Sequence, residues 1–134
     1  MKYGKKNVVF GFVYLIVTLL LGIFISFKMQ GDQSFAKEPF AFPRVIMRAA
    51  HAHGNLESVL NIIIGLIVDR LKISDSLKNI VTLLAIFGAV MHSGMLLILP
   101  LIPISGKLAP IVAISLVVTM ALMAYSASKG MEGK

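Results

Sequence analysis

Four polar residues, His51, His53, Glu57 and Asn61, lie inside a stretch of sequence that is otherwise apolar. Imidazole and carboxylate groups can bind a metal or haem iron, or transfer protons. A charge at the centre of a membrane helix costs about 2.5 to 3.5 kcal/mol on insertion scales, so such residues usually face a partner, a cofactor or a water-filled cavity. These four residues are therefore the first candidates for a functional site.

The composition indicates an integral membrane protein. The chain has 134 residues, of which 57% are hydrophobic and only 14% charged, and its mean hydropathy is +0.89. The absence of cysteine excludes thiolate zinc sites and iron-sulfur clusters. The net charge of +7 comes from short basic segments that flank the apolar runs, where bases set membrane topology, so we exclude nucleic acid as a partner.

The apolar runs predict a single transmembrane domain, residues 1–134, that folds as an all-α four-helix bundle. The helices are expected at about 7–27, 44–68, 79–99 and 110–126. Pro100 and Pro103 stop the third helix, and Pro110 suits the first turn of the fourth. The polar connection 28–43 is expected to be an external loop, and no cleavage site for a signal peptide follows the first span.

The basic residues predict the orientation. Eight Lys and Arg residues fall on one side and five on the other; the first set is Lys2, Lys5, Lys6, Arg70, Lys72, Lys78, Lys129 and Lys134, and the second is Lys28, Lys37, Arg44, Arg48 and Lys107. Because the richer side is cytoplasmic, we expect a multi-pass protein of the inner (cytoplasmic) membrane with both termini in the cytoplasm.

The helix expected at 44–68 carries two polar stripes when it is projected at about 100° per residue. One stripe follows spacings of three and four and comprises Arg44, Arg48, His51, Asn55 and Ser58; the other follows a spacing of four and comprises His53, Glu57 and Asn61. A helix in an isolated bundle has one inward face, so the second stripe indicates either a surface between subunits or a cavity that reaches around the helix.

Depth in the membrane places histidines of two helices in one layer. With a rise of about 1.5 Å per residue, His53 and His92 both lie ~4 to 5 Å outward of the midplane, and His51 lies slightly higher. The plain alternative is that these groups hydrogen-bond across helices. His51 and His53 diverge by about 160° around the helix and cannot easily bind one ion. Ligation of a haem iron requires only one histidine to be positioned correctly. Arg48 suits the interface or a haem propionate.

The second helix resembles that of a family of small membrane isomerases. The residues that carry the likeness are Pro43-Arg44, Ala50-His51-Ala52-His53, Leu56-Glu57, Val59 and Asn61. They are similar to the motif of the family that includes styrene oxide isomerase and hydroxylaminobenzene mutase. The histidine of that motif lies six residues before the asparagine, where this chain has Asn55.

The resemblance implies a trimer of four-helix subunits, each with haem b held by a second-helix histidine. Ferric iron there acts as a Lewis acid on the substrate oxygen, and the motif asparagine positions the substrate. Carried over, the iron ligand is His53 or His51 and the asparagine is Asn61. The family's arginine then corresponds to Arg44 and its glutamate to Glu57. We also assign to the cofactor site Arg48, as a partner for a propionate, and Asn55, which stands where the family has its histidine.

Three functions remain open from the sequence. The first is a haem b-dependent isomerase of a small apolar substrate, an aromatic epoxide or hydroxylamine, in which Glu57, Asn61 and His92 line the pocket. The second is a non-catalytic small subunit of a larger membrane oxidase or monooxygenase complex. The third is an electron-transfer cytochrome with both axial positions filled, for example by His53 and His92. A visible absorption spectrum separates them.

Overall fold

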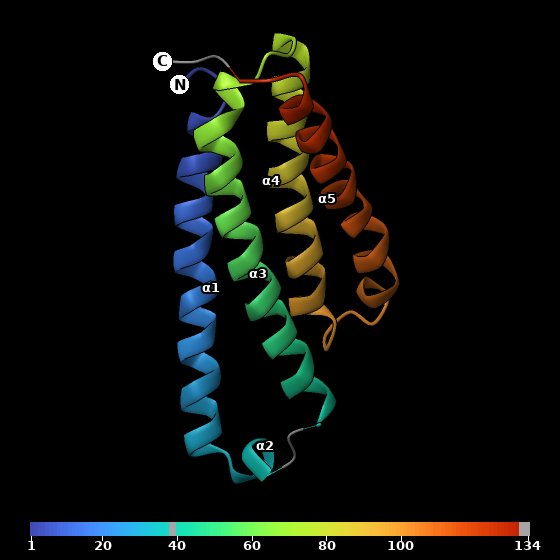
Figure 1. Ribbon diagram of the computed structural model, residues 1–134. Helices are drawn as coiled ribbons and strands as arrows, with labels where there is room; N and C mark the ends of the chain where they lie inside the picture. The colour runs from blue at the N-terminus through green and yellow to red at the C-terminus, as the bar shows by residue number, and fades with distance from the viewer. Residues whose placement is uncertain (38–39, 132–134) are drawn as a thin grey trace.

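The computed structural model describes residues 1–37 and 40–131, and within them the all-α prediction is confirmed. The elements are α1 (Lys5–Gly31), the short α2 (Gln33–Lys37), α3 (Phe42–Ile67), the 3-10 turn η1 (Val68–Arg70), α4 (Asp75–Ile98) and α5 (Ser105–Ser128) (Figure 1). The four long helices lie where the sequence predicts them. Part of the segment 28–43, expected to be a loop, is helical, since α1 continues to Gly31 and α2 follows it.

Three helices, α1, α4 and α5, are long and apolar enough to cross a membrane. α3 has a similar length, 26 residues, which at about 1.5 Å per residue also exceeds the hydrocarbon thickness of about 30 Å. It differs from the other three in carrying charged residues, Arg48 and Glu57, beyond its first and last turns. The most polar long helix is thus the one that carries the candidate site.

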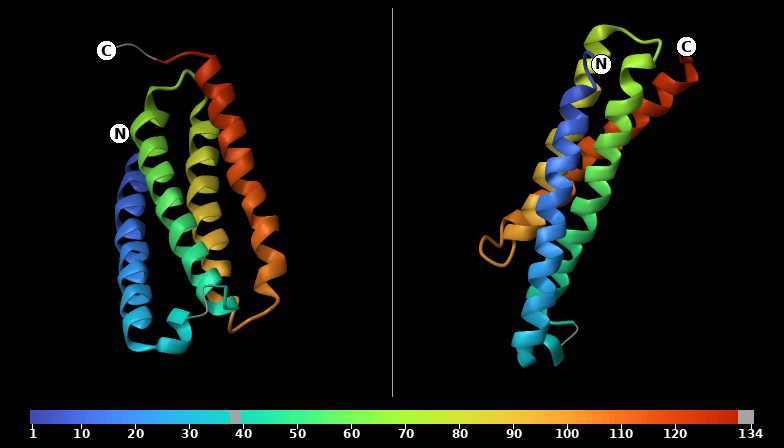
Figure 2. Two further views of the ribbon diagram at one scale, coloured as in Figure 1. Left: turned by 60° about the horizontal axis from the view of Figure 1, so that its bottom comes forward. Right: turned by 90° about the vertical axis from the view of Figure 1, so that its left-hand side faces the viewer.

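α3 lies between α1 and α4, and α5 packs along α4 on the side away from α3 (Figures 1 and 2). α1 also reaches α4, because the Tyr14 hydroxyl lies 2.6 Å from the Ser93 hydroxyl. The outer faces of α1 and α5 expose large apolar side chains, among them Phe12, Ile16, Ile114 and Val117. Because α3 has a helix on each of two sides, both of its polar stripes have neighbours within the same chain.

The start of α1 and the end of α5 lie at the same end of the bundle, beside the α3–α4 connection (Figure 1). Asp69 accepts hydrogen bonds from the backbone N–H groups of Tyr3 (2.8 Å) and Gly4 (3.2 Å). Partial burial acts to raise the pKa of Asp69, but these backbone hydrogen bonds outweigh it and hold the pKa below its usual value. The Lys72 N–H donates to the Gly130 carbonyl at 3.1 Å. The expected placement of both termini on one side therefore agrees with the fold.

The start of α5 differs from the prediction. The helix begins at Ser105, five residues before Pro110, and the Ser105 hydroxyl donates to the Met95 carbonyl at 2.9 Å. Pro110 consequently lies inside the helix, where it cannot donate the backbone hydrogen bond of that turn. α4 also begins earlier than predicted, because the Ser74 side chain caps its N-terminus by accepting from Leu77 N–H at 3.3 Å.

The crossing of α1 and α3 depends on a pair of glycines. A Cβ atom added to Gly65 would lie 2.6 Å from the carbonyl oxygen of Gly4 and 2.8 Å from the backbone nitrogen of Val8. Backbone atoms cannot move aside as a side chain can. Only residues without a Cβ let the two helices approach this closely.

We therefore expect Gly65→Ala to destabilise the protein by about 1 to 3 kcal/mol through overpacking. Gly94→Ala, in α4, is the matched control, because a Cβ there meets nothing within 4 Å. Thermal unfolding in detergent, followed by circular dichroism, measures both. Equal unfolding temperatures for the two variants would contradict the close crossing.

Candidate functional site

The two stripes of α3 face different helices. His51 and Asn55 contact α1, whereas Glu57 contacts α4 through His92. The second stripe needs neither a subunit interface nor a cavity around the helix to explain it. It packs against α4 of the same chain because α3 occupies the middle of the row of long helices.

His53, Glu57 and His92 form a cluster between α3 and α4. Nδ1 of His92 lies 2.6 Å from Oε1 of Glu57. The rings of His53 and His92 meet edge to face, with centroids 4.8 Å apart and planes inclined by 72°. Glu57 is only 2% exposed, while His53 is exposed. The cluster therefore has a buried carboxylate at its base and an accessible imidazole at its rim.

The donor atoms of this cluster suit a metal ion. One ligand atom from each of the three residues lies within 4.8 Å of the others. In a tetrahedral zinc site with bonds of about 2.1 Å the ligand atoms are about 3.4 Å apart, so binding of an ion requires the Glu57–His92 pair, at 2.6 Å, to open and the more distant ligand atoms to come together. Two imidazoles and one carboxylate are a donor set used for zinc and for non-haem Fe(II), both with positions left open for water or substrate.

The second carboxylate oxygen of Glu57 also favours a bound cation. Oε2 of Glu57 is buried and has no hydrogen-bond partner within residues 1–37 and 40–131. A buried carboxylate oxygen without a partner is costly. A cation held between Glu57 and the two imidazoles would compensate the carboxylate charge.

His51 lies on the other side of α3 and is held there by hydrogen bonds. Its Nδ1 lies 2.7 Å from the Thr18 carbonyl, and the side-chain nitrogen of Asn55 lies 3.3 Å from its Nε2. The ring packs so closely on α1 that a Cβ added to Gly22 would lie 2.5 Å from it. Both ring nitrogens of His51 are occupied. Asn55 is occupied too, since its Oδ1 accepts from the Thr18 hydroxyl at 2.6 Å.

Asn61 lies one turn from Glu57 but does not face an open space. It is 1% exposed, and its Oδ1 accepts from the Asn7 side chain at 2.9 Å. Its Nδ2 lies 3.1 Å from the Ala85 carbonyl and 3.0 Å from the Glu57 carbonyl. In this arrangement Asn61 joins α1, α3 and α4 and fixes the turn that presents Glu57.

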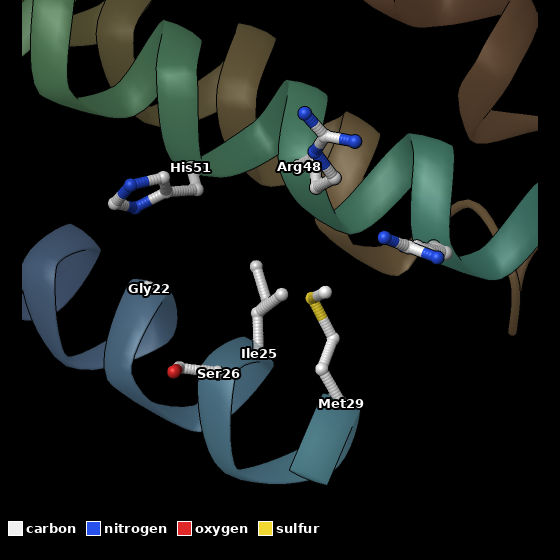
Figure 3. Close-up of a pocket in the computed structure, with 7 residues that line it drawn as sticks. Gly22, Ile25, Ser26, Met29, Arg48 and His51 are labelled. Carbon is white, nitrogen blue, oxygen red and sulfur yellow. The ribbon is translucent and has the colours of Figure 1, made fainter. Parts of the chain in front are cut away.

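The two arginines are grouped with His51 and lie away from His53. Arg44 is 7% exposed and donates from Nη1 to the carbonyls of Ala36 (2.7 Å) and Phe35 (3.3 Å). Arg48 is exposed, and both arginines line a cavity of about 330 Å³ between α1 and α3 together with His51 (Figure 3). The sequence analysis assigned the arginines, Asn55 and either His53 or His51 to one cofactor; the structure groups the arginines with His51 and leaves His53 outside that group.

Several residues that hold the site escaped the sequence analysis. Asn7, Tyr14 and Thr18 of α1 are the partners of Asn61, Ser93 and Asn55. With Gly11 and Gly22 they follow spacings of four, three, four and four along the first helix. That is a helical period, so the face of α1 that meets α3 and α4 is visible in the sequence.

Comparisons with known proteins identify a family but no activity. No curated protein and no solved structure matches the chain significantly. The model of the family described as Domain of unknown function (DUF8059) matches residues 4–133, and the chain therefore belongs to that family.

Proposed function

We propose that this protein is a membrane metalloprotein in which His53, Glu57 and His92 hold one transition-metal ion, zinc or ferrous iron, that acts as a Lewis acid. The observation that carries the proposal is the convergence of three donor atoms within 4.8 Å at a buried carboxylate. A Lewis acid polarises an oxygen atom of its substrate and stabilises the negative charge that develops there. The ligands come from two packed helices, which hold them more rigidly than loops would.

The surroundings of the cluster indicate an apolar substrate. His53 is exposed, and Leu56, about one turn further along α3, also exposes its apolar side chain, at 58%. If α3 crosses the bilayer with the other long helices, this surface faces hydrocarbon. A small apolar molecule with one ether, epoxide or hydroxylamine oxygen can then reach the metal laterally. Isomerisation of such a substrate conserves its atoms and needs no co-reactant.

A haem b isomerase is the second candidate. A specific observation favours His53 over His51 as its iron ligand. Of the two α3 histidines, His51 uses both ring nitrogens inside the protein, while His53 is exposed and makes no hydrogen bond to another described residue. An exposed ligand suits a cofactor held between subunits, as in the trimer that the family resemblance implies. Arg44 and Arg48 would then serve another ligand.

The membrane arrangement forms part of the proposal. Both chain ends lie beside the α3–α4 connection, as four antiparallel crossings require. The excess of Lys and Arg on that side places it in the cytoplasm. The candidate metal cluster then lies in the outer half of the cytoplasmic membrane.

Metal analysis and a visible spectrum of the same sample test the proposal. The protein is purified in a mild detergent without added metal chelators, and its metal content is measured by inductively coupled plasma mass spectrometry. About one zinc or iron per chain without a Soret band supports the three-residue centre. A Soret band with stoichiometric iron supports haem. A sample that contains no metal and shows no Soret band would contradict both candidates. The non-catalytic subunit of a larger complex would then be the remaining function.

A further inference from the structure

Two cavities beside Arg48 and His51 of α3 have no role in the proposed metal centre. One, of about 330 Å³, is lined by Gly22, Ile25, Ser26, Met29, Arg44, Arg48 and His51 (Figure 3). A second, of about 500 Å³, is lined by Phe40, Val45, Arg48, Ala49, His51 and Ala52. Arg48 and His51 belong to both, so the two cavities adjoin along the half of α3 that is nearest to α2.

Arg44 is the buried charge of this region. Its side chain is 7% exposed, and Nη1 donates to two carbonyls at the end of α2. Nε is buried and has no hydrogen-bond partner among the described residues. A guanidinium binds phosphate oxygens through paired N–H groups on one edge. The carbonyls thus fix the position of Arg44 and leave the edge that carries Nε for an anion.

The other groups around the cavities also suit an anionic headgroup. Arg48 supplies a second guanidinium, and Ser26 of α1 supplies an exposed hydroxyl. Neither cavity is lined by a carboxylate from the residues that the structure describes. The remaining lining is mostly apolar, as an acyl chain would need. An isolated buried guanidinium is costly, and a bound anion offsets that cost.

We propose that this region binds the phosphate group of an anionic phospholipid, with the headgroup on Arg44 and Arg48 and an acyl chain along the apolar lining. The inference does not depend on a metal at His53, because none of the three proposed metal ligands lines either cavity. A headgroup that also carries a cation, such as choline, is disfavoured by the two arginines. The site therefore discriminates by net headgroup charge.

Lipid retention measures the site directly. The protein is reconstituted with equal amounts of phosphatidylglycerol and phosphatidylcholine, extracted in detergent, and its bound lipids are counted by native mass spectrometry. We expect phosphatidylglycerol to be retained and Arg48→Gln to lower its retention at least threefold. Lys107→Gln removes the same charge from an exposed residue of α5 that lines neither cavity, and it should leave retention unchanged.

A second pair of variants tests the same site without removing a buried group. Ser26→Asp places a negative charge in the cavity and should lower phosphatidylglycerol retention about tenfold, whereas the neutral and similarly sized Ser26→Asn should not. Arg44→Gln should act in the same direction where it folds. The metal content of all these variants should equal that of the unaltered protein, which separates this inference from the proposed function.

Four results would overturn the proposal. They are equal retention of the two lipids, equal effects of Ser26→Asp and Ser26→Asn, and a rise in unfolding temperature with inorganic phosphate that matches the rise with phosphatidylglycerol. The fourth concerns Glu38, which follows α2 in the sequence and lies outside the described residues. If phosphatidylglycerol retention rises severalfold in Glu38→Gln, the partner of Arg44 in the unaltered protein is the Glu38 carboxylate and not a lipid phosphate.

Discussion

Replacing His53 with alanine is expected to remove the bound metal and leave the fold intact. His53 is exposed, and its contact with the rest of the site is the edge-to-face packing on His92. Changes in groups that merely support a metal ligand cost 10- to 100-fold in affinity, so loss of one of three ligands should lower affinity by at least about 100-fold. Metal content per chain and the unfolding temperature, measured on one preparation, report the two effects separately.

His51→Ala is the matched control for this substitution. It removes the same side chain two residues away, but from the face of α3 that meets α1. We expect His51→Ala to keep its metal and to lose stability, because the Thr18 carbonyl and Asn55 lose a partner. The opposite pattern, with metal kept in His53→Ala and lost in His51→Ala, would refute the assignment of the ligands.

Replacing Asn61 with alanine is expected to destabilise the protein by about 1 to 3 kcal/mol. Its amide makes two contacts with other helices, to Asn7 of α1 and to the Ala85 carbonyl of α4. Hydrogen bonds between membrane helices average about 0.6 kcal/mol and reach about 1.7 kcal/mol, and the two together with the lost packing give this range. Reversible unfolding in mixed detergent micelles measures the loss.

A double-mutant cycle with Asn7→Ala identifies the coupling. Each single variant removes the hydrogen bond between Asn7 and Asn61, so the double variant should lose less stability than the sum of the single variants. Asn7→Ala also removes the hydrogen bond that the Asn7 side chain donates to the Thr82 carbonyl at 3.0 Å. Asn61→Ala should retain metal, because Asn61 lies one turn behind Glu57 and is not a ligand. If Asn61→Ala were fully stable but lost activity on a substrate, the substrate-positioning role implied by the family resemblance would replace this account.

The sequence predicts the helices well because their signals are strong. Long apolar runs ended by prolines or charged residues place the four long helices, and Pro100 marks the end of α4 within two residues. The errors fall at the helix ends. Pro110 is equally compatible with a first helical turn and with a position deeper in α5, and the capping side chain of Ser74 was overlooked.

The candidate site is predicted only in part, because one helix cannot reveal its neighbours. The two stripes of α3 and the common depth of His53 and His92 follow from helical periodicity and length. Their depth places His53 and His92 in one layer of the membrane, and in the structure their rings are in contact. Which helix each stripe faces depends on the packing order of the whole bundle. Asn61 was therefore assigned to the substrate pocket and the arginines to the cofactor of a second-helix histidine, whereas Asn61 joins three helices and the arginines line a cavity between α3 and α1.

X-ray absorption spectroscopy of the metal-loaded protein tests the central claim most directly. The account predicts a first shell of about two imidazole nitrogens and at least one carboxylate or water oxygen at about 2.0 to 2.2 Å, with one imidazole lost from the spectrum of His53→Ala. A porphyrin signature, a shell of oxygen alone, or a spectrum that is identical in His53→Ala would contradict it.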